Sequence, residues 1–207
     1  LAARARGYTI AQASDVHVSA TIGRARGEEI AAAVRALGAD LVAITGDLVD
    51  GSVAELGPLL APLADLGAKD GVFFVTGNHE YLSGADEWLA FLPSLGIRAL
   101  RNERVAIGGE GGFDLIGVDD PSGASWLPGH GADLDAATRG RDPSRASVLL
   151  AHRPDDAPAA AARGIGLQIS GHTHGGQIEP IGWALERLHQ PYVCGLYEIG
   201  RTVLYVT

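Results

Sequence analysis

Short apolar runs alternate with segments of helical periodicity along this chain. Six of the runs have the length and composition of buried strands, at residues 8–13, 41–45, 72–76, 113–118, 148–151 and 167–170. Most of them are apolar almost throughout, which predicts strands that are covered on both faces. Such strands, alternating with helical segments, indicate βα units around a largely buried sheet, and therefore an α/β fold.

The segments between these runs carry helix signals. Gly38 follows one periodic stretch, and glycine readily takes the left-handed conformation that ends a helix. Ser52 and Glu55 have the spacing of a capping box, and Trp88 and Phe91 lie on an apolar helix stripe that we assign to the core. We expect helices at residues 28–37, 85–95 and 155–163, and a closing pair of strands at 196–199 and 202–206.

Polar residues that can bind metal follow five of the apolar runs. Each comes directly after a predicted strand: Asp15, Asp47, Asn78, His152 and His172. In open α/β sheets ligands bind beyond the carboxyl ends of the strands, so these five loops should meet at one rim. Carboxylate, imidazole and amide groups are donors that first-row divalent cations prefer, and no thiolate is among them. The sequence therefore predicts a metal site.

The residues around these positions supply enough ligands for two ions. Asp47 is the candidate bridge, because a carboxylate offsets the repulsion between two cations about 3.5–4 Å apart. Asp15 and His17, two positions apart on an extended segment, project to the same side and should hold one ion, whose shell His174 would close. The other ion is expected to be completed by Asn78, His152 and His172.

This chemistry points to hydrolysis of a phosphate ester. Two metals lower the pKa of bound water, so a hydroxide bridging them would act as the nucleophile. His79 is placed to protonate the leaving oxygen or to stabilise phosphoryl charge, and Asp50 would hold its imidazole. The glycines before Asp47, Asn78 and His172 should let the chain turn sharply and let substrate approach the backbone.

Length and charge narrow the possible functions. A chain of 207 residues with 46% hydrophobic content fits one domain with a single core. Its 16 basic and 25 acidic residues give a net charge of -9, which disfavours stable binding to nucleic acid or to an anionic membrane. The single cysteine, Cys194, leaves the redox compartment open. No apolar run approaches the roughly 20 residues that span a bilayer, so we expect this domain to be soluble.

Five motifs follow one another in a fixed order: Asp15-Val16-His17, Gly46-Asp47-Leu48-Val49-Asp50, Gly77-Asn78-His79-Glu80, His152 and Gly171-His172-Thr173-His174. In these motifs the chain resembles the calcineurin-like metallophosphoesterases. The resemblance implies a single-domain, four-layer α/β/β/α sandwich with a dinuclear site. It also implies one ion bound by Asp15, His17, Asp47 and His174, and a second bound by Asp47, Asn78, His152 and His172. His79 would be the acid or phosphate-contacting residue, with Asp50 as its partner.

An extension of the last motif through Gln177 is similar to a bacterial branch that is often membrane-associated or exported. In that branch the chain usually continues past the last strands. Because this chain also begins at Leu1 and contains no methionine, we interpret residues 1–207 as a catalytic domain excised from a longer chain. The resemblance suggests membrane proximity through a missing anchor. Gly51 stands where some lipid-precursor pyrophosphatases carry arginine, which argues against that exact substrate.

Several polar residues have simpler interpretations. His130 and His189 are expected to be solvated loop residues. The pair Asp119-Asp120 should begin a turn, with a supporting role at the metals as the alternative. Glu80 should order its loop rather than bind metal. Arg153 should either contact a phosphate oxygen or form a surface salt bridge.

Together these observations predict a metal-dependent hydrolase for a phosphodiester or pyrophosphate, since no basic cluster is present to hold a dianionic monoester. The cofactors would be two divalent ions, either manganese, zinc or iron. The substrate would be a small phosphorylated compound, lipid- or nucleotide-linked. Two alternatives stay open: a phosphomonoesterase or protein phosphatase using the same site, and a catalytically silent metal-binding scaffold. A scaffold should have lost at least one of Asp47, Asn78, His79 or His172, and all four are present.

Overall fold

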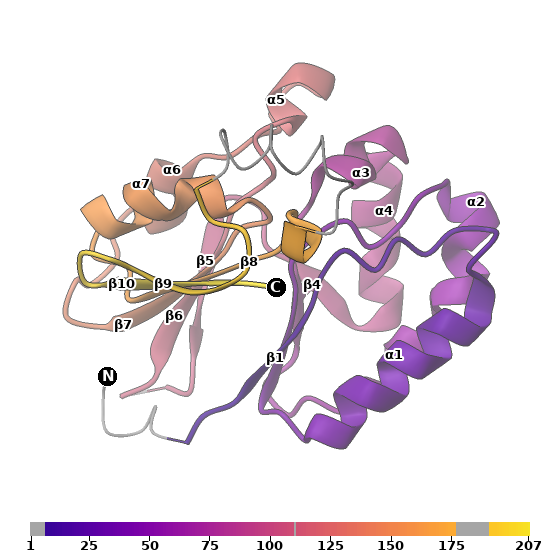
Figure 1. Ribbon diagram of the computed structural model, residues 1–207, viewed down its shortest axis with the longest axis horizontal. Helices are drawn as coiled ribbons and strands as arrows, with labels where there is room; N and C mark the ends of the chain where they lie inside the picture. The colour runs from indigo at the N-terminus through magenta and orange to yellow at the C-terminus, as the bar shows by residue number, and fades with distance from the viewer. Residues whose placement is uncertain (1–6, 110, 177–190) are drawn as a thin grey trace.

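The computed structural model describes residues 7–109, 111–176 and 191–207. In them two β-sheets pack face to face between layers of helices (Figure 1). The first sheet has the strand order β1-β2-β3-β4, and all of its strands are parallel. Its strands are β1 (Ile10–Ala13), β2 (Leu41–Ile44), β3 (Val72–Phe74) and β4 (Ile97–Ala99). Parallel neighbours need crossover connections, which the intervening helices supply.

The second sheet has the order β5-β6-β7-β8-β10-β9. Strands β6, β7, β8 and β10 are parallel, whereas the edge strands β5 and β9 run antiparallel to their neighbours. Their bounds are β5 (Glu103–Ile107), β6 (Phe113–Gly117), β7 (Ala146–Leu150), β8 (Leu167–Ser170), β9 (Gly195–Ile199) and β10 (Thr202–Val206).

Helices cover the outer face of each sheet. On the first sheet these are α1 (Gly23–Leu37), α2 (Val53–Leu56), η2 (Gly57–Ala64), α4 (Ala85–Phe91) and η3 (Leu92–Leu95), which bury Trp88 and Leu60 against Val42, Ile44 and Phe74. On the second sheet, α6 (Leu134–Thr138), η4 (Pro154–Asp156) and α7 (Ala157–Ala162) form the covering layer over Ile116 and Leu149. Three short elements, α3 (Asn78–Leu82), α5 (Gly123–Trp126) and η5 (His174–Gly176), lie in loops after strands.

A separate core joins the two sheets. Leu41 and Phe73 of the first sheet pack against Phe113, Leu115 and Val148 of the second. With the two helix-covered faces, this interface completes an α/β/β/α sandwich, so the predicted fold class is confirmed. None of the helices in the described residues is both long and apolar enough to cross a membrane.

All eight predicted strands occur, with small shifts at their ends. The apolar runs alone do not distinguish one sheet from two, because a strand covered by a helix and one covered by another sheet are equally apolar. The two sheets agree with the sandwich that the resemblance implied. The helix predicted at 28–37 begins earlier, at Gly23. The helix predicted at 85–95 changes to 3-10 geometry at Leu92, next to Pro93. Strands β4 and β5 were missed, since one is only three residues long and the other is half-exposed.

Candidate metal centre

The loops after β1, β2, β3, β7 and β8 meet at one rim of the sandwich. The first two run side by side, because the main-chain N–H groups of Asp15 and His17 donate to the carbonyls of Gly46 and Asp47, each at 3.1 Å. The last two are joined by a 3.0 Å hydrogen bond from the N–H of Gly171 to the carbonyl of His152. All seven predicted ligands lie on these five loops.

The backbone at this rim is held in an unusual conformation. Six non-glycine residues of the described chain have positive φ, and five of them are predicted ligands: Asp15, His17, Asp47, His172 and His174. A positive φ is costly for residues with a β-carbon and persists only where the surroundings impose it. The strained conformations therefore coincide with the positions that carry metal-binding groups.

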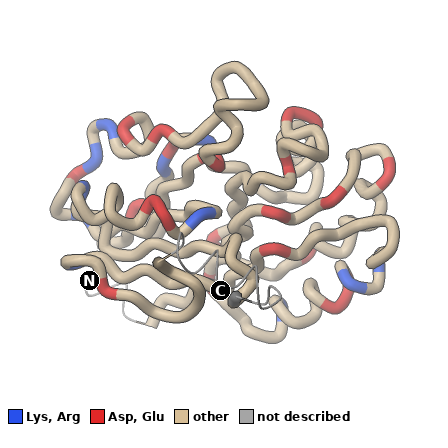
Figure 2. Tube along the Cα trace, turned by 45° about the horizontal axis from the view of Figure 1, so that its top comes forward, with Lys and Arg blue, Asp and Glu red and all other residues tan. Residues whose placement is uncertain are grey.

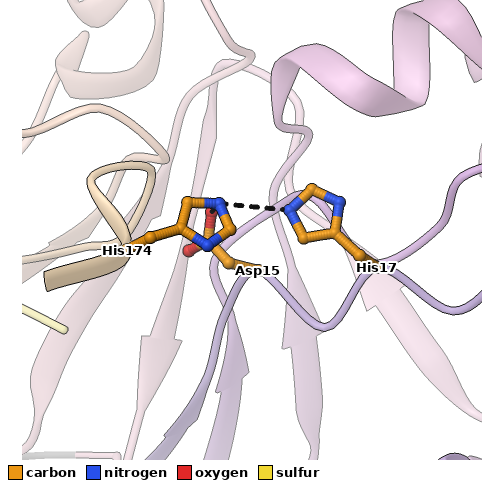
Figure 3. Close-up of side chains that lie close together, drawn as sticks. All are labelled: Asp15, His17 and His174. Carbon is orange, nitrogen blue, oxygen red and sulfur yellow. Dashed lines mark hydrogen bonds and ion pairs between the residues drawn. The ribbon is translucent and has the colours of Figure 1, made fainter. Parts of the chain in front are cut away.

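The first group of ligand atoms belongs to Asp15, His17 and His174, all within 4.8 Å of one another. Figure 3 shows the rings of His17 and His174 facing each other beside Asp15. Their Nε2 atoms are 3.3 Å apart, and the Nε2 of His174 lies 3.5 Å from Oδ1 of Asp15. Two imidazole nitrogens at this separation repel through their lone pairs unless they share a proton or a cation.

The second group consists of Asp47, His152 and His172. The Nδ1 of His152 lies 2.7 Å from the carbonyl oxygen of Thr45, so it is the protonated nitrogen. Its Nε2 then points at Oδ2 of Asp47 (3.2 Å) and at Nδ1 of His172 (3.1 Å). In neutral His152 that nitrogen presents a lone pair to a carboxylate, an arrangement that requires a proton or a metal ion between them.

Asn78 gives independent support for a cation-binding site at this rim. Its side-chain Oδ1 is buried and has no hydrogen-bond partner in the described part of the chain. A buried polar oxygen without a partner is destabilising, and few occur in folded proteins. An amide oxygen at this rim, beside the carboxylate and imidazole groups, fits a divalent cation as its partner.

Asp47 occupies the position between the two groups. It is 2% exposed, and its Oδ2 lies 3.2 Å from His152, 3.9 Å from His79 and 4.0 Å from His17. Its Oδ1 accepts a 2.8 Å hydrogen bond from the main-chain N–H of His79. This location suits the bridging role that we expected for Asp47.

Asp50 contacts two histidines rather than one. Its Oδ1 lies 2.6 Å from Nδ1 of His79, the pairing that the sequence suggested. The same carboxylate also lies 3.1 Å from Nδ1 of His17, a contact that the sequence reasoning missed. Both imidazoles are therefore oriented through their Nδ1 atoms, which leaves each Nε2 directed at the rim.

Glu80 orders the loops, as its position in the motif suggested. Its carboxylate is 1% exposed and accepts hydrogen bonds from the main-chain N–H groups of Asp47 (3.0 Å), Leu48 (2.8 Å) and Gly77 (2.6 Å). One buried side chain thus ties the loop after β2 to the loop after β3. Burial, reinforced by the negative charge of Asp47, raises the pKa of Glu80 to about 7.

The electrostatics of the second group are those of a site that holds positive charge. Burial opposes ionisation of Asp47, yet its hydrogen bond to His152 and the charge of that ring bring the pKa of Asp47 to about 2. Burial likewise opposes protonation of His152, but Asp47 raises its pKa to about 9. Burial and the neighbouring His152 lower the pKa of His172 to about 4. Without metal, a proton on His152 serves as the counter-charge.

The glycines before the ligands have a packing role in addition to the one expected. A β-carbon at Gly77 would collide with the carboxylate of Asp47, and one at Gly171 would collide with Ser14 and Asp15. These two positions make room for the ligands of neighbouring loops. The positive φ of Gly46 (86°) agrees with the sharp turn expected before Asp47.

Of the predictions for the remaining polar residues, the structure corrects some and confirms others. His130 is not a solvated loop residue: its side chain is 6% exposed, and its Nε2 lies 3.1 Å from Asp86. Asp120 does begin a turn, since it accepts from the N–H of Ser122 at 2.8 Å, but its carboxylate is fully buried against Arg153. Asp119 is equally buried and is paired with Arg101. His189 and Gln177 lie outside the described residues.

Comparisons with known proteins agree with this geometry. Residues 8–176 match the model of a family described as calcineurin-like phosphoesterase. The chain is 39% identical over 206 residues to a Bos taurus protein named "Transmembrane protein with metallophosphoesterase domain", covering 94% of this chain and 46% of that protein. It is 38% identical over 196 residues to an uncharacterized metallophosphoesterase of Helicobacter pylori, covering 94% and 52%.

A solved structure shares the fold. The sulfate thiohydrolase SoxB of Thermus thermophilus superposes with a TM-score of 0.51 at 21% identity, covering 88% of this chain and 36% of that one. The chain spans about half the length of the curated relatives named above. Since the family model covers most of the residues and both relatives are more than 30% identical, this chain belongs to the calcineurin-like phosphoesterase family.

Proposed function

We propose that this chain is a metal-dependent phosphoesterase that cleaves a phosphodiester or a pyrophosphate. The observation that carries the proposal is the buried Oδ1 of Asn78, which lacks a partner in the described residues at a rim built from carboxylate and imidazole groups. That donor set matches a divalent metal centre. Membership in the phosphoesterase family supports hydrolysis of a phosphate ester as the reaction.

The proposed centre holds two divalent ions, either manganese, zinc or iron. One would be bound by Asp15, His17, Asp47 and His174, and the other by Asp47, Asn78, His152 and His172, in line with the two groups of converging ligand atoms. When bound, two such ions activate water and neutralise charge on a phosphoryl group.

His79 is the proposed acid. Asp50 accepts from its Nδ1 at 2.6 Å and so stabilises the protonated imidazolium, which leaves Nε2–H available to donate to the leaving oxygen. The side chain is 36% exposed, so a substrate at the rim can reach it. The main-chain N–H of His79 is bound to Asp47, which fixes the acid relative to the ligands.

A diester or pyrophosphate is proposed in preference to a monoester. In the view of Figure 2, Lys and Arg positions are scattered among acidic ones and do not gather into a stripe. Such a surface disfavours nucleic acid as a partner and suits a small phosphorylated substrate.

Membrane proximity of the whole protein is also proposed, supported by relatives that are named transmembrane proteins.

Hydrolysis of bis-p-nitrophenyl phosphate and p-nitrophenyl phosphate tests these proposals. Metal-stripped protein is resupplied with manganese, zinc or iron, and Asp47→Asn and His79→Ala are compared with Asp65→Asn, a change at an exposed position. Metal-dependent cleavage of the diester that needs Asp47 and His79 but not Asp65 is expected. Much faster cleavage of the monoester would overturn the diester preference. Tight metal binding without any cleavage would favour a scaffold.

A further inference from the structure

Arg153 directly follows His152 and is held in place by a buried carboxylate. Its Nε lies 2.9 Å from Oδ2 of Asp120 and its Nη2 lies 3.4 Å from Oδ1. Asp120 is fully buried, and its Oδ1 accepts hydrogen bonds from the N–H (2.8 Å) and the Oγ (2.6 Å) of Ser122, so the carboxylate is fixed in place. The two-point contact therefore fixes the plane of the guanidinium.

The main chain of Arg153 is fixed as well. Its carbonyl oxygen accepts hydrogen bonds from Nε2 of Gln168 (3.1 Å) and from Oγ of Ser170 (3.3 Å). Both donors are fully buried in β8. Pro154 follows, and a residue before proline is restricted to extended backbone, which Arg153 adopts with φ -90 and ψ 139. Arg153 is therefore held more firmly, in both its side chain and its main chain, than a surface salt bridge requires.

Part of the guanidinium is left for another partner. An arginine side chain has five N–H donors, and the contacts with Asp120 use one on Nε and one on Nη2. Within the described residues no other acceptor contacts this side chain, which is 29% exposed. The free edge has the fork geometry that binds phosphate oxygens in pairs.

The side chain lies beside the metal ligands and not among them. On extended backbone, consecutive side chains point to opposite sides, so His152 faces Asp47 while Arg153 turns toward the loop after β6. The Asp120 that holds it lies next to a ligand loop, because the N–H of Asp120 donates to Oγ1 of Thr76, two residues before Asn78. A phosphoryl group held by the ligands would thus have the Arg153 fork next to it, in reach of the adjoining part of the substrate.

We propose that Arg153 binds a second phosphoryl group of the substrate, which makes a diphosphate-linked diester the substrate class of this site. The inference rests on the proposed phosphoesterase function. Arg153 is then a substrate-binding residue, and its partner Asp120 is a positioning residue. The buried carboxylate sets the direction of the fork and neutralises its charge in the absence of substrate.

The chain contains a matched control. Arg101 forms the same kind of pair with the fully buried Asp119, through Nε at 3.2 Å and Nη2 at 2.7 Å. It follows the edge strand β4, further across the first sheet from the ligand loops after β1 to β3. Removing Arg101 leaves an unpaired buried carboxylate just as removing Arg153 does, without touching the proposed subsite.

The experiment compares metal-loaded wild type, Arg153→Ala, Arg153→Lys and Arg101→Ala. Steady-state kinetics use bis-p-nitrophenyl phosphate, which has one phosphoryl group, and diadenosine diphosphate, which has two. Arg153→Ala should raise KM for the diphosphate about 10- to 100-fold, the range for a lost hydrogen bond to a charged group, and change the single-phosphoryl substrate less than about threefold. Arg153→Lys keeps the positive charge beside Asp120 but not the fork of the guanidinium. Its KM for the diphosphate should lie between those of wild type and Arg153→Ala.

Binding of a non-hydrolysable methylene analogue of diadenosine diphosphate, measured by calorimetry, gives a readout independent of turnover. Selective weakening in Arg153→Ala, with Arg101→Ala like wild type, supports the proposal. Equal losses for both substrates, or the same selectivity change in Arg101→Ala, would overturn it. Wild type that binds the analogue but cleaves neither substrate with any metal contradicts the proposed phosphoesterase function and leaves the Arg153 subsite standing.

Discussion

The carboxylate of Glu80 accepts a 3.0 Å hydrogen bond from the main-chain N–H of Asp47. Because it also binds the N–H groups of Leu48 and Gly77, Glu80→Ala leaves three buried donors without an acceptor. We expect a loss of about 3–5 kcal/mol in the free energy of unfolding, together with weaker metal binding. Urea unfolding and metal content measure the two effects. Glu87→Ala, at an exposed position of α4, is the control and should change neither.

Asn78→Ala should have opposite effects on the metal-free and metal-loaded protein. It removes a buried oxygen that lacks a partner, so metal-free stability should be unchanged or slightly higher. It also removes a proposed ligand, so the affinity for one of two ions should fall at least about tenfold, and the thermal stabilisation by metal should shrink. Asn78→Asp, which retains an oxygen donor, is the control. Retention of both ions at wild-type affinity by Asn78→Ala would remove Asn78 from the ligand set.

Asp50→Asn should lower kcat more than it raises KM. The amide cannot stabilise the imidazolium of His79 as the carboxylate does at 2.6 Å, and general acid catalysis contributes on the order of 10²–10⁴-fold. We expect a fall in kcat of about 10- to 100-fold on the diester. Metal content must be measured in parallel, because Asp50 also holds His17. A kcat close to that of wild type would contradict the assigned role.

Asp156 should make stability depend on pH in a defined window. Burial and the negative charges of Asp120 and Asp155 raise the pKa of Asp156 from its ordinary 3.8 to about 6, and its Oδ2 is buried without a partner in the described residues. The folded state therefore keeps this proton longer than the unfolded chain does. The contribution of the protonated Asp156 carboxyl to the free energy of unfolding is fully present below about pH 3.8. It is lost as the pH rises through about 6.

Replacing the Asp156 carboxyl by an amide should remove this pH dependence of stability. Asp156→Asn should be more stable than wild type by about 3 kcal/mol at pH 8 and nearly equal to it at pH 4. Urea unfolding in the presence of a chelator measures this difference. Asp65→Asn, at an exposed position that is not among the charges acting on Asp156, should show little change at either pH. A gain at pH 4 as large as at pH 8 would show that charge is not the cause.

The candidate ligands could be placed at one rim from the sequence because their motifs come directly after apolar runs. That placement follows from general behaviour of strands in α/β folds and does not depend on long-range detail. The pairing of Asp50 with His79 was likewise accessible, since both belong to short motifs at the same rim. The burial of Trp88 was predicted from its helical spacing.

Other features depend on contacts that no local pattern encodes. Asp50 and His17 are 33 positions apart, and nothing near either one signals their contact. His130 was misassigned because its flanking glycines look like a solvated loop, whereas Tyr81 packs against its ring. The role of Thr45 is carried by its carbonyl oxygen, which is invisible in the side-chain sequence. The apolar runs alone could not divide the strands between two sheets, because that division depends on what covers each strand; it came only from the resemblance in the motifs.

The two sheets come from consecutive halves of the chain, β1 to β4 before residue 100 and β5 to β10 after it. Four proposed ligands belong to the first half and three to the second, and each of the two proposed ion sites draws on both. During synthesis the N-terminal half emerges first and carries only part of either set. A complete ion site therefore cannot exist until His172 and His174 have left the ribosome. Metal acquisition would be a late event in the maturation of this protein, and a chain cut between the sheets would need both fragments to bind its ions.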